Sequence, residues 1–293
     1  MKNKVFLIGS ILFAIISVSL GLVVSKNRQA NLLADSANYK NISTVKVKEE
    51  KKQIVTFGDS IFGNVRDYTS VPSVIENETN QTVKNVAFGG TRSSLLSKES
   101  PWNSLAFTSL VDEVVKDETD ETKWKYQNES MGEETFLNYF EDGLTTLKEI
   151  DFNEVDIITI AFGTNDFTSE IPLDGEDVGS FQGSMNNSIN KLKNKYPNTE
   201  IVVISPAYRY WKTESGEFLN DSDSNVLNGN KLTDFVSMTE KIAKDNGVKY
   251  INNYGLINFD NKDEYFDKED STHPNKAGRY LIGENVAKEL NNK

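Results

Sequence analysis

Short runs of β-branched and aromatic residues alternate with segments of helical periodicity over residues 51–293. Five of these runs predict strands, and four of the five end at a glycine or a proline. They cover residues 53–57, 83–88, 156–162, 201–205 and 248–252. Single strands that alternate with helices are typical of βαβ units. We therefore expect an α/β domain built on a parallel sheet of about five strands.

Apolar side chains recur on one helical face before the fourth strand, before the fifth strand and at the end of the chain. These faces comprise Met185, Ile189, Leu192 and Tyr196; Leu232, Phe235, Val236, Ile242 and Ala243; and Ile282, Val286 and Leu290. We expect the last helix to begin at Pro274, since proline suits a first turn. Residues 91–154 are long for one crossover. This insertion is either a wall of a binding site or a solvated surface excursion.

The N-terminus predicts a membrane segment. Residues 5–24 are 20 consecutive residues without a charge, and Lys2 and Lys4 precede them. A helix of this length spans a bilayer core of about 30 Å. We predict a cytoplasmic stub over residues 1–4, an uncleaved signal anchor over 5–24 and a polar tether over 25–50. The domain over 51–293 is then expected outside the cytoplasm, and secretion after signal cleavage is the alternative.

The amino-acid composition excludes several classes of partner, metal site and catalytic mechanism. The net charge of −12 argues against nucleic acid as a partner, because phosphate contacts need clustered Lys and Arg. The chain has no cysteine, which excludes disulfides, thiolate catalysis and cysteine-ligated metals. Its single histidine excludes a histidine-rich metal site and leaves one imidazole for base chemistry. We expect neither a metal nor an organic cofactor.

Small and polar residues follow the predicted strands, and ligands bind beyond the carboxyl ends of parallel strands. Ser60 follows the first strand and precedes an expected helix, so its hydroxyl is placed at this rim. A serine hydroxyl needs a base, and the only imidazole belongs to His273. Asp270 lies three residues earlier, where its carboxylate can orient the ring. Each signal alone also has a structural interpretation: Gly89-Gly90 as a turn and Asn165-Asp166 as a helix cap.

The combination is more specific. FGDSI at 57–61, NVAFGG at 85–90, GTND at 163–166 and DSTHP at 270–274 resemble, in order and spacing, the four motifs of the SGNH (GDSL-type) hydrolases. The resemblance covers about residues 53–290 and implies a flavodoxin-like three-layer α/β/α sandwich.

By the same resemblance, Ser60 is the nucleophile, His273 the base and Asp270 the acid of the triad. Gly90 and Asn165 join the backbone N–H of Ser60 as oxyanion-hole donors. Gly89 is the alternative to Gly90, and the spacing from the asparagine of that motif favours Gly90. Asp59 is expected to be a structural neighbour of the nucleophile rather than a catalyst.

The implied activity is that of a serine esterase or acylhydrolase acting on ester-linked acyl groups of a small molecule, glycan or lipid. O-acetyl groups on cell-surface glycans are the first candidate. An O-acyltransferase with the same triad, a lipid esterase and a non-catalytic wall-binding module are the alternatives. The fourth strand is followed by Tyr208, Arg209, Tyr210 and Trp211. These four residues form either a surface that stacks on a sugar or steers an anionic polymer, or an ordinary loop.

Overall fold

The computed structural model describes residues 51–292. The predicted stub, signal anchor and tether lie outside the described residues. Within the described part of the chain, no helix combines the length and the apolar character needed to span a bilayer.

The core of the domain is a five-stranded sheet in which every neighbouring pair is parallel. Its strands stand in the order β2 (Thr82–Asn85), β1 (Gln53–Gly58), β3 (Ile157–Ala161), β4 (Glu200–Ile204) and β7 (Lys249–Ile251). Counted along the chain within this sheet, the order is the flavodoxin-like 2-1-3-4-5. All five predicted strands form, and the predicted fold class is confirmed.

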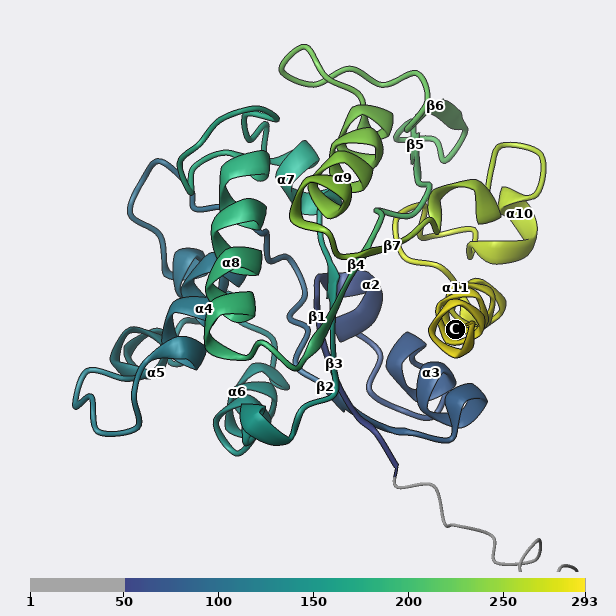
Figure 1. The fold of residues 1–293 in the computed structure, drawn as a ribbon. Coiled ribbons are helices and arrows are strands. Elements are labelled where there is room, and N and C mark those ends of the chain that lie inside the picture. The colour runs from purple at the N-terminus through teal and green to yellow at the C-terminus, as the bar shows by residue number, and fades with distance from the viewer. Residues whose placement is uncertain (1–50, 293) are drawn as a thin grey trace, which may run out of the picture. The chain divides into compact units, whose positions relative to one another are not determined.

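Helices cover both faces of the sheet, which Figure 1 shows nearly edge-on. One face carries α4 (Phe107–Val115), α6 (Phe140–Lys148), α8 (Phe181–Lys195) and α9 (Leu232–Asn246); the other carries α2 (Ser60–Gly63), α3 (Val71–Thr79) and α11 (Lys276–Asn291). The connections hold α5 (Lys125–Ser130), α7 (Thr164–Thr168), α10 (Lys262–Tyr265) and the 3₁₀ turns η1 (Pro101–Leu105), η2 (Phe152–Glu154) and η3 (Tyr254–Leu256). The apolar faces predicted from the sequence are those that α8, α9 and α11 pack against the strands, except that α9 buries Met238 and leaves the predicted Val236 outside the core.

Much of the insertion over residues 91–154 belongs to the core, whereas residues 117–138 within it are mostly exposed. It forms η1, α4, α5 and α6, and α4 packs against α8. Phe107, Leu110 and Val111 of α4 are at most 1% exposed. Trp102 of η1 reaches the strand ends, where its ring packs against Gly90. The insertion therefore covers one face of the sheet and also reaches the rim.

Two local predictions were wrong. The last helix begins at Lys276 with Asn275 as its N-cap, because Pro274 is occupied in a bridge with Phe266 and its carbonyl accepts a hydrogen bond from Arg279.

The chain after β4 is not a plain loop. It folds into an antiparallel hairpin of β5 (Tyr210–Lys212) and β6 (Phe218–Asp221), strands too short to leave a clear alternation in the sequence.

Candidate active site

Three strands of the sheet end at one level and place their following loops side by side. Gly58, the last residue of β1, is in register with Ala161 at the end of β3. Its carbonyl accepts a hydrogen bond from the N–H of Phe88, just beyond β2. The segments that carry Ser60, Gly90 and Asn165 therefore leave neighbouring strands at the same edge, at the point where the strand order reverses.

Ser60 is the first residue of α2 and is 7% exposed. Asp59 is the N-cap, and its carboxylate accepts the N–H of Ile61 at 3.0 Å. The backbone N–H of Ser60 has no acceptor among the described residues. A serine in this position presents both a hydroxyl and a free N–H at the rim, where the first turn of a helix favours negative charge.

Ser60, His273 and Asp270 form one hydrogen-bonded chain. The Nε2 atom of His273 lies 2.9 Å from the Oγ atom of Ser60, and its Nδ1 atom lies 2.7 Å from Oδ2 of Asp270. In the neutral ring, a proton on Nδ1 is donated to the carboxylate, so that the Nε2 lone pair faces the hydroxyl. The structure thus brings together three residues that are up to 213 positions apart.

Backbone contacts fix the loop that carries the imidazole. Oδ1 of Asp270 accepts the N–H groups of Thr272 and His273 at 2.8 and 2.9 Å. The N–H of Tyr210 donates to the carbonyl of Ser271 and ties the loop to the β5–β6 hairpin. Burial raises the pKa of Asp270, but the hydrogen bonds from His273 and Thr272 outweigh it and leave the pKa below its ordinary value. Asp270 is therefore ionised across the range in which an imidazole titrates.

The two glycines of the second motif differ in what their N–H groups do. The N–H of Gly89 donates to the phenol oxygen of Tyr139 at 2.7 Å. The N–H of Gly90 has no acceptor in the part of the chain that the structure describes. Gly90 also adopts a φ of +76°, and a Cβ there would lie 3.1 Å from the ring of Trp102. Of the two, Gly90 is therefore the one with a donor to offer a ligand.

Asn165 lies in the first turn of α7, not at its cap. The helix begins after Gly163, whose φ of +127° suits a residue without a side chain. One hydrogen of the Asn165 amide goes to the carbonyl of Thr91 at 2.8 Å. The second amide hydrogen has no acceptor among residues 51–292. The helix-cap interpretation of Asn165 and Asp166 was therefore wrong.

Asp166 is a buried residue of this site that the sequence did not single out. It is 0% exposed and accepts hydrogen bonds from Ser93 and Ser94 on the segment that follows Gly90. Burial raises its pKa, while these hydrogen bonds and nearby Arg92 oppose the rise. Its position next to Asn165 was the one signal available in the sequence, since Ser93 and Ser94 carry no motif of their own.

The residues after β4 divide into two pairs. Tyr208 and Tyr210 are buried, at 1% and 4% exposed, and pack in a small core of the hairpin. Arg209 and Trp211 are only partly buried, and the guanidinium lies 4.6 Å from the indole centroid. The Nη2 atom of Arg209 donates to Oγ1 of Thr272, the neighbour of His273. Of the predicted stacking surface, only this second pair lies beside the site.

Two charged groups near Ser60 have displaced pKa values. Burial raises the pKa of Asp59 to about 7, and Asp166 adds to the rise, while the N–H of Ile61 and the charge of Arg209 act against it. Burial also lowers the pKa of Arg209 to about 10, against the opposing charges of Asp270 and Asp59. Asp59 caps α2 and is influenced by the charges of both Asp166 and Arg209.

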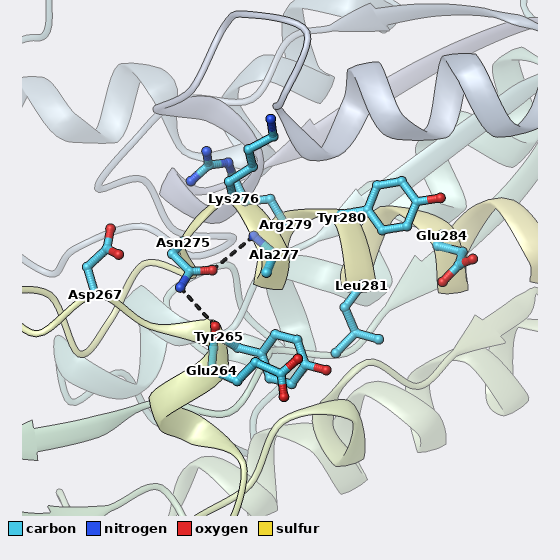
Figure 2. Close-up of a pocket in the computed structure, with 10 residues that line it drawn as sticks. All are labelled: Glu264, Tyr265, Asp267, Asn275, Lys276, Ala277, Arg279, Tyr280, Leu281 and Glu284. Carbon is cyan, nitrogen blue, oxygen red and sulfur yellow. Dashed lines mark hydrogen bonds between the residues drawn. The ribbon is translucent and has the colours of Figure 1, made fainter.

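A separate hollow of about 870 Å³ lies along the start of α11 and beside α10 (Figure 2). Its walls are formed by Tyr265, Asp267, Lys276, Tyr280 and their neighbours, and neither Ser60 nor His273 lines it. Within residues 51–292, no group of three or more acidic or histidine side chains is gathered closely enough to hold a metal ion.

Comparisons with known proteins agree with this architecture. A sequence profile of the GDSL-like lipase/acylhydrolase family matches residues 56–281. A solved structure of a protein from Lactobacillus plantarum is 17% identical with a TM-score of 0.54 over 82% of this chain and 96% of that one. A GDSL-like lipase from Bacteroides ovatus is 15% identical with a TM-score of 0.51 over 84% and 100% of the two chains. A carbohydrate acetylesterase from Sinorhizobium meliloti is 12% identical with a TM-score of 0.50 over 82% and 98%. No curated protein matches the chain in sequence.

Proposed function

Because this chain belongs to the GDSL-like lipase/acylhydrolase family, a family of ester hydrolases, we propose that it is a serine esterase in which Ser60 is the nucleophile. The observation that carries the proposal is the unbroken chain of hydrogen bonds from Ser60 through His273 to Asp270. Such a chain removes the proton that makes a serine hydroxyl a weak nucleophile.

In the first half of the reaction, Oγ of Ser60 bonds to the ester carbonyl carbon while its proton passes to Nε2 of His273. The bond to the alcohol oxygen then breaks, and the imidazolium returns that proton to the leaving alkoxide. A water molecule repeats the two steps on the acyl-enzyme and releases the carboxylic acid. Asp270 holds the ring in the required tautomer and stabilises its charged form.

Three donors are available for the oxyanion: the N–H groups of Ser60 and Gly90 and the second amide hydrogen of Asn165. None has an acceptor within residues 51–292, whereas the neighbouring N–H of Gly89 does. Ser60 is buried and Gly90 and Asn165 are partly buried, and a donor shielded from water without an acceptor is destabilising unless a ligand completes it. Their presence beside the nucleophile supports an oxyanion hole that is filled only when substrate carries a developing charge.

Hydrolysis of a chromogenic acetate ester by purified protein, without an added acceptor, tests this function. We expect turnover that is lost in Ser60→Ala, with the variant keeping the wild-type thermal midpoint. An O-acyltransferase would release the acyl group slowly until a sugar acceptor is supplied. The side chains of His273 and Asp270 are 38% and 43% exposed, which leaves water access to the base and favours hydrolysis.

For the substrate, we propose O-acetyl groups on a glycan. The partly buried Arg209–Trp211 pair beside Thr272 supports this, because an indole and a guanidinium suit a sugar ring and an anionic substituent. Trp211→Ala should raise KM for an acetylated oligosaccharide by roughly tenfold and leave a chromogenic acetate unchanged. A preference for long-chain esters over acetate would instead favour the lipid-esterase alternative.

We further propose that residues 5–24 anchor the domain to a membrane on its outer side. The support is the uncharged run itself, which lies outside the described residues. Carbonate extraction of membranes should leave the full-length chain in the pellet and release a chain lacking residues 1–50. Release of both would overturn the anchor and favour secretion after cleavage.

A further inference from the structure

The segment that follows Gly90 has no regular secondary structure, yet it is buried. Thr91 and Arg92 are 1% and 6% exposed, and Ser93 and Ser94 are 0% exposed. A buried segment without a helix or a ladder must find other partners for its polar groups. Because this segment directly follows Gly90, the partners that hold it also fix the position of the Gly90 N–H.

The carbonyls of Arg92 and Ser93 accept the N–H groups of Phe107 and Thr108 at the start of α4. The donors of Ser93 and Ser94, by contrast, converge on one carboxylate. Oδ1 of Asp166 accepts the N–H and the Oγ–H of Ser94 at 3.1 and 2.8 Å and the Oγ–H of Ser93 at 3.0 Å. Oδ2 accepts the N–H of Ser93 at 3.1 Å. Three of these four donors therefore lie at Oδ1 and one lies at Oδ2, so both oxygens of the carboxyl group hold the segment.

The seryl groups are held from a third side by α8. The hydroxyl oxygen of Ser184 lies 2.9 Å from that of Ser93 and 3.0 Å from that of Ser94, and its proton is the one available to these two contacts. Side-chain rotation at the two serines is therefore restricted. The contacts span 72 and 73 positions of sequence, so they tie two distant segments to each other.

The same two segments carry the two non-nucleophile donors of the oxyanion hole. Asn165 precedes Asp166 on α7, and its amide donates to the carbonyl of Thr91, next to Gly90. One asparagine contact and one aspartate contact therefore join α7 to residues 91–94. We propose that Asp166 is a positioning residue of the esterase: it sets the distance between the N–H of Gly90 and the amide of Asn165. The inference rests on the proposed function and adds a residue to it.

Asp166→Asn tests the proposal. The amide places an NH₂ group against donors that now face a carboxylate, so the segment should shift without an empty space being created. We expect kcat for a chromogenic acetate to fall by roughly tenfold to a hundredfold, somewhat less than for loss of a whole oxyanion donor, while KM changes by less than about twofold. A structural role alone would lower the thermal midpoint and leave the kcat of the folded enzyme unchanged.

A double-mutant cycle with Asn165→Ala makes the test specific. In the Asn165→Ala background the side-chain amide is absent, so the distance between it and the N–H of Gly90 no longer affects the reaction. The loss caused by Asp166→Asn should therefore be at least about fivefold smaller in the Asn165→Ala background than in the wild type. Equal losses in the two backgrounds would overturn the proposal.

The chain supplies matched controls. Glu113 of α4 is a buried carboxylate that likewise accepts a loop N–H, that of Trp124 at 2.5 Å, away from the site. Glu113→Gln should lower stability without lowering kcat. If Asp166→Asn does not fold, Ser94→Ala removes one donor only and enters the same cycle, with Ser188→Ala as the control that removes a buried hydroxyl without a partner within residues 51–292.

Two variants distinguish an error in the proposed function from an error in the role of Asp166. If Ser60→Ala keeps the activity of the wild type, the proposed function is wrong. If Ser60→Ala is inactive but Asp166→Asn, or Ser94→Ala in its place, has the kcat of its control, only the role of Asp166 is wrong.

Discussion

The site has two sides that are built in different ways. The oxyanion side is buried: Asp166, Ser93 and Ser94 are 0% exposed and their hydrogen bonds are to one another and to α8. The acid–base side is open, with the side chains of Asp270 and His273 at 43% and 38% exposed. The nucleophile stands between them at the end of β1.

The difference in solvent exposure matches the chemical role of each side. Donors that stabilise a developing charge act best when they are fixed before the reaction, which burial and a full set of hydrogen bonds provide. A base that loses and regains protons in every cycle needs access to water and some freedom. Substitutions on the buried side should therefore affect kcat through geometry, whereas those on the open side should affect proton transfer and its pH dependence.

The largest effects on kcat are expected at the nucleophile, which lies between the two sides, and at the base. Ser60→Ala and His273→Ala should each lower kcat by roughly 10³-fold or more, because the covalent route is lost. The chain holds no second imidazole to replace His273. Steady-state kinetics on folded, circular-dichroism-matched protein measures this. Residual activity within tenfold of wild type in either variant would remove that residue from the mechanism.

On the buried side, Asn165→Ala should lower kcat by about 10²–10³-fold and leave KM nearly unchanged. The reason is that the free amide hydrogen meets the carbonyl oxygen mainly when it carries charge. Michaelis parameters for a chromogenic acetate separate the two effects. A rise in KM with constant kcat would make Asn165 a ground-state binding residue instead.

On the open side, Asp270→Asn should lower kcat/KM by roughly tenfold to a hundredfold, since its NH₂ group favours the wrong imidazole tautomer. We expect a smaller loss than for a buried triad acid because water screens a side chain that is 43% exposed.

Asp270 also makes a prediction about pH in the wild type. Its pKa lies below its ordinary value, so Asp270 remains charged as the pH is lowered from neutral to mildly acidic. The logarithm of kcat/KM should therefore fall with a slope of one as the pH is lowered from neutrality. A slope of two above pH 5 that persists in Asp59→Asn would show that Asp270 titrates together with the base.

The smallest effect concerns Asp59, which lies between the two sides. Its pKa in the folded protein is about 7 against an ordinary 3.8, so the folded chain keeps a proton that the unfolded chain has lost. Its contribution to stability is present at low pH and declines as the pH rises from about 4 to 7. Asp59→Asn keeps the cap acceptor for Ile61 and removes the ionisation.

Thermal unfolding at two pH values measures this contribution. Relative to wild type, Asp59→Asn should gain several degrees in Tm at pH 8 and little at pH 4. An equal difference at both pH values would mean that Asp59 does not ionise in this range.

What the sequence predicted also differs between the two sides. Asp270 and His273 lie three positions apart, so their contact follows from local spacing, and strand ends place Ser60 near them. The contacts of Asp166 with Ser93 and Ser94 cross from one strand connection to another, and no local pattern announces them. The motif spacing favoured Gly90 over Gly89, but the reason that only Gly90 has a free N–H is the contact of Gly89 with Tyr139, 50 residues away, which no local pattern indicates.

The fold was predicted more completely than its connections. The three inner strands β1, β3 and β4 are rich in β-branched residues, and their burial on both faces of the sheet explains these continuous runs. The edge strands β2 and β7 each contain a lysine and are only partly buried. The hairpin after β4 was missed because β5 and β6 have 3 and 4 residues. Its burial of Tyr208 and Tyr210 depends on Phe266 and Ile257, which follow much later in the chain.

Covalent labelling with a serine-directed fluorophosphonate tests the central claim most directly. Intact-mass measurement and peptide mapping should find one adduct, located on Ser60, formed far more slowly in His273→Ala and absent from Ser60→Ala. Labelling of Ser60→Ala at the wild-type rate, or of a different serine in the wild type, would contradict the assignment of Ser60 as a nucleophile activated by His273.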